Sequence, residues 1–182
     1  MERSAHLSAG VDPRGWQDDL SWATDRLAVS GHEPAAWPAL LSRQQAIAAV
    51  IDLRAEACDD ALAHREAGIA FLHLPTPDLH PVTQDMLDRG VDFARRHLAA
   101  GRRVLIHCHH GIGRAPLLAL CVLAADGMAP LEALSLLKAR RWKVSPSPEQ
   151  YRGWSEWLER NGLAAPDFGR FCEIAYAHLA TA

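Results

Sequence analysis

Apolar residues form three short uninterrupted runs along the middle of the chain, at residues 46–54, 68–75 and 102–108. Runs of this length without polar alternation are typical of strands that are buried on both faces of a parallel sheet. Residues 20–31 predict further short strands, and the segment 32–45 predicts a loop followed by a short helix. The pattern therefore predicts a sheet whose central strands lie between two layers of helices.

Helical spacing of apolar residues separates the second run from the third. It extends over residues 82–101, where Gly101 marks the expected end of the helix. A strand, a helix and a strand in this order form the crossover unit of an α/β sheet. Another helix is expected from Arg114 to about Asp126. Three more are expected near the C-terminus, at residues 130–140, 148–160 and 167–180.

These elements predict a single-domain α/β fold with a central, mostly parallel sheet of four to five strands, flanked by helices on both faces. A length of 182 residues suits one such domain. The expected division is a main domain over residues 1–160 and a helical appendage over residues 161–182. Phe168, Phe171 and Leu179 form an apolar stripe on the last helix, so the appendage is expected to pack back on the core.

The composition is ordinary for a globular protein, with 49% apolar and 23% charged residues and a net charge of -3. This charge argues against nucleic-acid binding through a basic face, and no apolar run reaches the ~20 residues of a membrane span. The N-terminal segment has no hydrophobic stretch of the signal-peptide type. Cys58, Cys108, Cys121 and Cys172 show no paired spacing, which predicts free thiols in a reducing compartment and a cytoplasmic location.

Candidate chemistry is concentrated in the loop after the third apolar run, which reads HCHHGIGRAP. In α/β folds ligands bind at the carboxyl ends of strands, and a helix N-terminus presents unpaired N–H groups. Gly111 and Gly113 let the backbone curl so that several amides face one anion. Such amides stabilise a thiolate at Cys108, and Arg114 can grip two phosphate oxygens at once. The combination predicts nucleophilic attack on phosphorus.

The consecutive residues His107, Cys108, His109 and His110 also raise the alternative of a metal site. Structural zinc usually takes ligands spaced two to four residues apart in two separate pairs, because adjacent side chains diverge. The sequence has no second cluster with that spacing, so neither a metal nor another cofactor is predicted. His109 and His110 are expected either to line the phosphate pocket together with Ile112 or to be exposed on the loop.

Release of the alcohol or phenol requires a general acid from outside this loop. Asp78 is the candidate, because it lies in the proline-stiffened segment LPTPDLHP directly after the second apolar run. Asp52, inside a predicted strand, and Asp59, in the loop after it, are less suitable. His80, two residues after Asp78, either orients the acid or is a solvent-exposed loop residue.

The segment HCHHGIGR, together with LPTPDLHP and VIDLRAE, resembles the cysteine-based protein tyrosine phosphatases, particularly their compact dual-specificity branch. The resemblance extends over most of residues 20–160. It implies that Cys108 is the nucleophile, Arg114 the phosphate clamp and Asp78 the general acid. It also implies that His107 tunes the thiolate from behind the loop. Relatives that act on inositol phosphates or lipids tend to carry lysines in this loop, and this loop has none.

Ala115 departs from the pattern of most family members, which carry serine or threonine directly after the arginine. In the family, that hydroxyl stabilises the departing thiolate while the phosphocysteine is hydrolysed. The segment GIGRAP is similar to the phosphatases of regenerating liver, which share the alanine and the proline. The resemblance implies a slow second step and a long-lived covalent intermediate. The farnesylation signal of those proteins is absent, so their membrane location is not expected here.

Two further side chains leave alternatives open. Gln150 could position the hydrolytic water, as a glutamine does in some relatives, but the segment from Ser147 to Gln150 also fits a capping box at a helix start. In several relatives, a cysteine close to the position that Cys58 has in this chain protects the nucleophile by disulfide exchange. The sequence does not fix the distance between Cys58 and Cys108.

The pair Arg140 and Arg141, at the end of a predicted helix, is expected to be solvated, with a substrate-facing rim as the alternative. In all, the sequence predicts a monomeric, cysteine-dependent enzyme that hydrolyses phosphomonoesters on proteins or small molecules through a phosphocysteine. The alternative is a pseudophosphatase that binds phosphorylated partners with negligible turnover.

Overall fold

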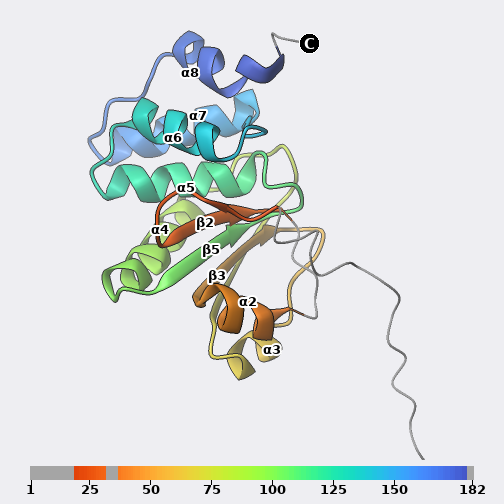
Figure 1. Cartoon of the computed structure of the whole chain (residues 1–182). Helices are drawn as coiled ribbons and strands as arrows, with labels where there is room; N and C mark the ends of the chain where they lie inside the picture. Colours follow the sequence, from red (N-terminus) through yellow and green to blue (C-terminus); the bar gives the residue numbers. More distant parts are fainter. Residues whose placement is uncertain (1–18, 32–36, 180–182) are drawn as a thin grey trace, which may run out of the picture.

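The computed structural model describes residues 19–31 and 37–179, and a five-stranded sheet lies at its centre (Figure 1). The strands are β1 (Ser21–Trp22), β2 (Leu27–Ser30), β3 (Ile47–Arg54), β4 (Ala70–Thr76) and β5 (Arg103–His107). Their order across the sheet is β1-β2-β5-β3-β4. β1 pairs with β2 antiparallel, and the other pairs are parallel. Part of the loop predicted before residue 38 and both ends of the chain lie outside the described residues.

Helices cover both faces of this sheet, which confirms the predicted α/β fold (Figure 1). On one face lie α2 (Pro38–Gln45) and α3 (Ala61–Glu66), and on the other lie α4 (Gln84–Ala99) and α5 (Arg114–Ala125). Beyond α5 lies an outer layer of α6 (Pro130–Arg140), α7 (Pro148–Arg160), α8 (Phe168–Ala175) and the 3₁₀ turn η1 (Ala177–Leu179). The helix α5 is therefore enclosed by protein, and its residues 114–124 are buried.

The central strands are apolar over most of their length because each of their two faces contributes to a separate hydrophobic cluster. Along β3, Ala49 and Ile51 point into the larger cluster beneath α4 and α5, whereas Val50 points into the smaller cluster beneath α2 and α3. Residues that alternate along a strand lie on opposite faces of a sheet, so both faces of β3 must be apolar. This explains why the sequence shows continuous runs.

The structure departs from the sequence prediction at two helices. Helix α3, capped by the Asp60 carboxylate, occupies a segment where only a loop was predicted. Its six residues are too few to show a helical period. The last helix was predicted over residues 167–180, but α8 ends at Ala175 and η1 follows it. Gly101 has a φ of +74° just after α4, as expected for a helix-ending glycine.

No helix in residues 19–31 and 37–179 is long and apolar enough to span a membrane. The helix α5 is buried along almost its whole length, yet it has only 12 residues. A span needs about 20. Its apolar character follows from its position between the sheet and the outer helices.

The segment after residue 160 packs on α7 through an aromatic cluster. The ring of Phe171 is fully buried, and its centroid lies 4.8 Å from that of Tyr151 and 6.1 Å from that of Trp154. The hydroxyl of Tyr151 donates a hydrogen bond to the backbone oxygen of Pro166 at 2.6 Å. These contacts are those expected of an appendage that docks on the core, although the division at residue 160 stays a prediction.

If this docking stabilises the fold, Phe171→Ala should lower the free energy of unfolding by about 3–5 kcal/mol, the usual cost of emptying a buried phenylalanine site. Phe168→Ala, three residues earlier on the same helix, is the control because its side chain is 39% exposed. Urea denaturation of both variants would measure the difference. Equal losses of stability in the two variants would contradict the packing described for Phe171.

Candidate active site

The loop of residues 108–113 lies where β5 ends and α5 begins, at the carboxyl edge of the parallel strands. The Cys108 side chain is only 2% exposed, and the backbone N–H of Gly111 points at its sulfur at 3.3 Å. Gly111 has a φ of +62°, and a Cβ there would lie 2.6 Å from the backbone oxygen of Ser30. The loop therefore requires glycine at this position for both its conformation and its space.

Carbonyl groups of the same loop are held on the opposite side by a buried arginine. Arg141 donates to the backbone oxygens of Gly111 at 2.6 Å and His110 at 2.9 Å, and it also pairs with Asp19. The backbone N–H of Ser145 donates to the oxygen of Ile112 at 3.0 Å. With these carbonyls turned outward, the loop amides are free to face an anion. The prediction of a solvated Arg141 was wrong, because its side chain is only 3% exposed.

Arg114 is buried and held in one orientation. Its Nη1 donates to Glu56 Oε2 and to the backbone oxygen of Thr76, and its Nη2 donates to Glu56 Oε1, all at 2.8 Å. A guanidinium has five N–H donors, so Nε–H and one Nη2–H remain. These two lie along one edge of the group, the geometry that grips two phosphate oxygens. The hydrogen bonds from Arg114 lower the pKa of Glu56 to about 2.

Glu56 was not singled out from the sequence. It lies two residues after β3, within the segment VIDLRAE, and its carboxylate is 42% exposed. A lone glutamate after a strand gives no local signal, because its partner Arg114 is 58 residues away in the chain. Only the assembled sheet brings the two together.

Asp78 lies across the same cavity from Cys108. It follows β4, is 55% exposed, and has its Oδ1 3.3 Å from Arg114 Nε. The cavity has a volume of about 100 Å³. It is lined by Asp78, Leu79, Cys108, His110, Ile112, Gly113, Ser145 and Gln150. The structure therefore brings the predicted nucleophile and the predicted acid to one small cavity, and it places the predicted clamp, Arg114, beside the acid.

Helix α7 holds the loop that carries Asp78. Ser147 Oγ donates to the backbone oxygen of Leu79 at 2.8 Å, and Gln150 Nε2 donates to that of His80 at 3.3 Å. Ser147 and Gln150 also form the predicted capping box at the start of the helix. Gln150 in addition lines the cavity and is so close to Gly113 that a Cβ on Gly113 would collide with it. It is thus placed both as a cap and beside the reacting groups.

The family model of the polymorphic toxin system DSP-PTPase phosphatases matches residues 35–128, just over half of the chain. The chain belongs to this family. This confirms the predicted membership of the compact dual-specificity phosphatases. The matched region includes Glu56, Asp78, Cys108 and Arg114, whereas Arg141 and Gln150 lie beyond it.

Relatives with known names are similar over part of their length. Phosphatidylglycerophosphatase and protein-tyrosine phosphatase 1 of Mus musculus is 32% identical over 95 residues, which cover 51% of this chain and 49% of that protein. The chain thus spans about half the length of this curated relative. Among solved structures, Tk-PTP in its active form has a TM-score of 0.71 at 24% identity, covering 78% of this chain and 97% of that one. PTPMT1 in complex with PI(5)P has a TM-score of 0.73 at 22% identity, covering 79% and 96%. These two structures show the shared fold.

His107, the last residue of β5 in this DSP-PTPase, is buried behind the loop. Its Nε2 lies 2.8 Å from Asp59 Oδ2, and Arg54 bridges Asp59 to Asp52. Burial alone would raise the pKa of Asp59, but His107 and Arg54 outweigh it and lower that pKa. The cluster sets two buried carboxylates against Arg54 and His107. Asp59, predicted only as a loop residue, is therefore the contact that fixes the imidazole directly before Cys108.

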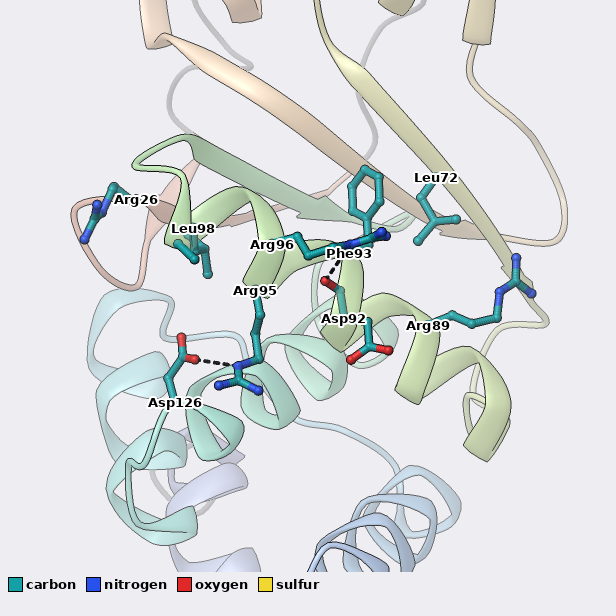
Figure 2. A pocket seen from close by; sticks show the side chains of 10 residues that line it. Arg26, Leu72, Arg89, Asp92, Phe93, Arg95, Arg96, Leu98 and Asp126 are labelled. Atoms are coloured by element: carbon teal, nitrogen blue, oxygen red, sulfur yellow. Dashed lines mark hydrogen bonds and ion pairs between the residues drawn. The ribbon is translucent and has the colours of Figure 1, made fainter.

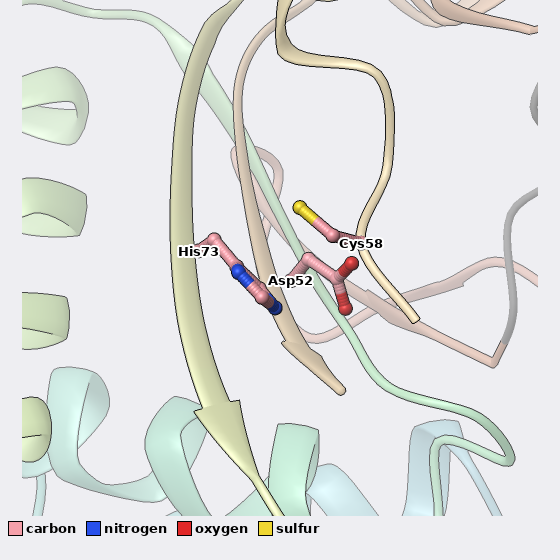
Figure 3. A group of neighbouring side chains, drawn as sticks. All are labelled: Asp52, Cys58 and His73. Carbon is pink, nitrogen blue, oxygen red and sulfur yellow. The ribbon is translucent and has the colours of Figure 1, made fainter. Parts of the chain in front are cut away.

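Asp52 also lies near Cys58 and His73, a trio with metal-ligating side chains (Figure 3). Its carboxylate already accepts hydrogen bonds from Arg54 on both oxygens and from the backbone N–H of Asp59. His73 Nε2 lies 2.7 Å from the backbone oxygen of Arg54. Asp52 and His73 therefore hold the end of β3 and the segment that follows it, and the four hydrogen bonds to Asp52 occupy its carboxylate lone pairs.

The remaining predicted residues lie on the rim. His109 and His110 are exposed, with ring centroids 4.3 Å apart. His110 lines the cavity above Cys108, whereas His109 lines an adjoining hollow with Glu56 and Asp78. Ala115 is fully buried in the first turn of α5. His80 is exposed on the Asp78 loop.

The buried carboxylate of Asp59, which forms an ion pair with Arg54 and lies against His107, predicts a pH-dependent loss of stability. Asp59→Asn should lower the free energy of unfolding by about 3 kcal/mol at neutral pH, the usual cost of breaking a buried ion pair. Because the pKa of Asp59 is lower in the folded state than the ~3.9 of a free carboxyl, this contribution is complete above about pH 4 and is lost as the pH falls further. The difference in the free energy of unfolding between wild type and variant should therefore become smaller in acid.

Urea denaturation across a pH series would measure this difference. Asp60→Asn is the matched control, because Asp60 is the exposed neighbour and asparagine caps a helix about as well as aspartate. We expect a change within about 0.5 kcal/mol for that variant. A difference for Asp59→Asn that stays constant down to pH 2 would rule out the charged pair as its cause.

Proposed function

We propose that the chain hydrolyses phosphomonoesters through a phosphocysteine intermediate, in the manner of the tyrosine and dual-specificity phosphatases. The observation that carries this proposal is the free edge of Arg114. After Glu56 and Thr76 have fixed the guanidinium, Nε–H and Nη2–H remain on the side facing Asp78. A dianionic phosphoryl group bound there lies over the sulfur of Cys108 and within reach of the loop amides.

The first step forms an S–P bond and breaks the P–O ester bond. The Cys108 thiolate attacks phosphorus in line with the leaving oxygen, and Asp78 gives that oxygen its proton. The amides of the loop and Arg114 hold the three equatorial oxygens, where charge develops. Thr76, through its backbone oxygen, keeps Arg114 in place for this contact.

The second step releases phosphate. Asp78, now a carboxylate, takes a proton from a water molecule that attacks phosphorus, and the electron pair of the S–P bond returns to the Cys108 sulfur. Gln150 lines the cavity beside Gly113 and is placed to orient this water. The helix N-terminus of α5 favours the returning thiolate, although Ala115 offers it no hydroxyl.

The substrate is proposed to be a phosphorylated protein side chain or a small phosphomonoester, bound by a monomer. Asp78 and Leu79 stand at the exposed mouth, and Cys108 lies at the buried end. The mouse relative is named both for a lipid phosphatase and for a protein tyrosine phosphatase activity. Phosphate release from a panel of substrates would show which class the chain hydrolyses. The panel contains phosphotyrosine, phosphoserine and phosphothreonine peptides, phosphatidylglycerophosphate and phosphoinositides.

Rapid-mixing kinetics with p-nitrophenyl phosphate test the proposed chemistry. We expect a burst of about one equivalent of p-nitrophenol per active site, followed by a slower steady rate, because the second step is slow. Cys108→Ser should abolish both phases while the fold persists, and Cys172→Ser is the control because that cysteine lies on α8. Catalysis retained by Cys108→Ser would refute the nucleophile assignment. A wild-type chain that releases no p-nitrophenol would favour a phosphate-binding module instead.

Ala115→Ser tests the proposed cause of slow turnover. A hydroxyl at this position would stabilise the thiolate that leaves during the second step, so the steady rate should rise about tenfold while the burst amplitude falls. The burst rate constant should stay within about twofold, because the first step does not use this hydroxyl. Pre-steady-state measurements of both phases check this. An unchanged steady rate would mean that Ala115 does not limit turnover.

A further inference from the structure

A second hollow, larger than the cavity at Cys108, runs along α4 on another part of the surface (Figure 2). Its volume is about 780 Å³, and we call it the α4 groove. It is lined by Arg26, Leu72, Arg89, Asp92, Phe93, Arg95, Arg96, Leu98, Ala99 and Asp126. Arg26 precedes β2 and Asp126 follows α5, so the groove reaches the amino edge of the sheet, opposite the edge that carries Cys108.

Positive charge exceeds negative charge in this groove. Four arginines face two aspartates there, whereas the whole chain has a net charge of -3. Within residues 19–31 and 37–179, neither Arg26 nor Arg96 has a carboxylate partner, and Arg96 donates only to the backbone oxygen of Asp92. Arg95 pairs with Asp126 at 2.8 Å, but both side chains are about half exposed. Such a pair is weak in water and exchanges readily for another carboxylate.

A neighbouring histidine responds to this excess of positive charge. His97 lies on α4, and its pKa is lowered by burial and by the charges of Arg102 and Arg96. Arg96 and Arg102 therefore both contribute positive charge close to His97.

The floor of the groove is apolar. Leu72 of β4 and Phe93 and Leu98 of α4 are each only partly buried, although they pack against the main hydrophobic cluster. Figure 2 shows the side chains of Leu72 and Phe93 among those that line the groove, together with the arginines of α4. Arginines beside exposed apolar surface, with few carboxylates, are typical of a protein-binding patch.

We infer that the α4 groove is a docking surface for an acidic polypeptide segment that carries an apolar side chain. Its carboxylates would pair with Arg26, Arg89 and Arg96, and its apolar side chain would cover Leu72 and Phe93. Residues 89–99 of a helix extend over about 15 Å, at 1.5 Å per residue, which matches about five residues of extended chain. An occupant of this kind fits both the charge and the length of the groove.

This docking is independent of the proposed phosphatase reaction, because no residue of the groove lines the cavity at Cys108. A fluorescein-labelled octapeptide of glutamate and leucine is the probe, and fluorescence anisotropy measures its dissociation constant. The double variant Arg26→Glu/Arg96→Glu should weaken binding about tenfold or more, and binding should weaken as salt is added. Cys108→Ser should bind the probe as wild type does.

The matched control is Arg152→Glu/Arg170→Glu, which reverses two exposed arginines on α7 and α8. It should leave the affinity within about twofold, and circular dichroism verifies that each variant is folded. A probe with serine in place of leucine should bind less tightly. The inference is overturned if both double variants bind the probe equally, if the serine probe binds as well, or if a single-stranded oligonucleotide competes more strongly at the same arginines.

Discussion

The candidate site depends on the direction in which six consecutive peptide groups point. Residues 108–113 can present their N–H groups to one anion only if their carbonyl groups have partners on the other side, because a buried carbonyl without a partner is costly. Arg141 supplies those partners for His110 and Gly111, and Ser145 supplies one for Ile112. Both residues come from the segment after α6, thirty residues and more along the chain. The conformation of residues 108–113 therefore depends on tertiary contacts, although the sequence resembles a local motif.

The orientation of Arg114 likewise depends on residues distant in the sequence. A free guanidinium has many orientations, and fixing it at the moment of binding would cost side-chain entropy. Glu56 and Thr76 fix it in advance by using three of its five donors. The two donors left over are those on the edge that faces Asp78. Asp78 lies 3.3 Å from that edge, so a bound phosphoryl group would take the place now nearest to the acid. The arrangement holds Arg114 and Asp78, the proposed clamp and the proposed acid, close together.

The sequence patterns predicted the fold and the candidate reactive residues. They did not predict the side chains that hold those residues in place. The three apolar runs predicted β3, β4 and β5, and that signal is local. It is explained by burial of both faces for β3 and β5, whereas the edge strand β4 is only partly buried. The loop of Cys108 was visible because its glycines and arginine follow one another. Glu56, Asp59 and Arg141 were missed or misjudged, since each acts on a residue distant in sequence and carries no pattern of its own. The sequence alone does not distinguish a buried arginine from an exposed one. Helix α3 was missed for a different reason, because six residues are fewer than two helical turns.

The C-terminal segment contacts the same stretch of chain that holds the loop of residues 108–113. Lys138 on α6 donates to the backbone oxygens of Val144 at 2.7 Å and Ala175 at 2.6 Å, and the hydroxyl of Tyr176 donates to that of Pro146 at 2.6 Å. Residues 144 and 146 flank Ser145, whose N–H donates to the carbonyl of Ile112 in the loop of residues 108–113. The end of α8 is thus two contacts away from the amides that would surround a phosphate. Because packed interiors transmit small displacements, the docking of this segment and the position of Ser145 against the loop are linked.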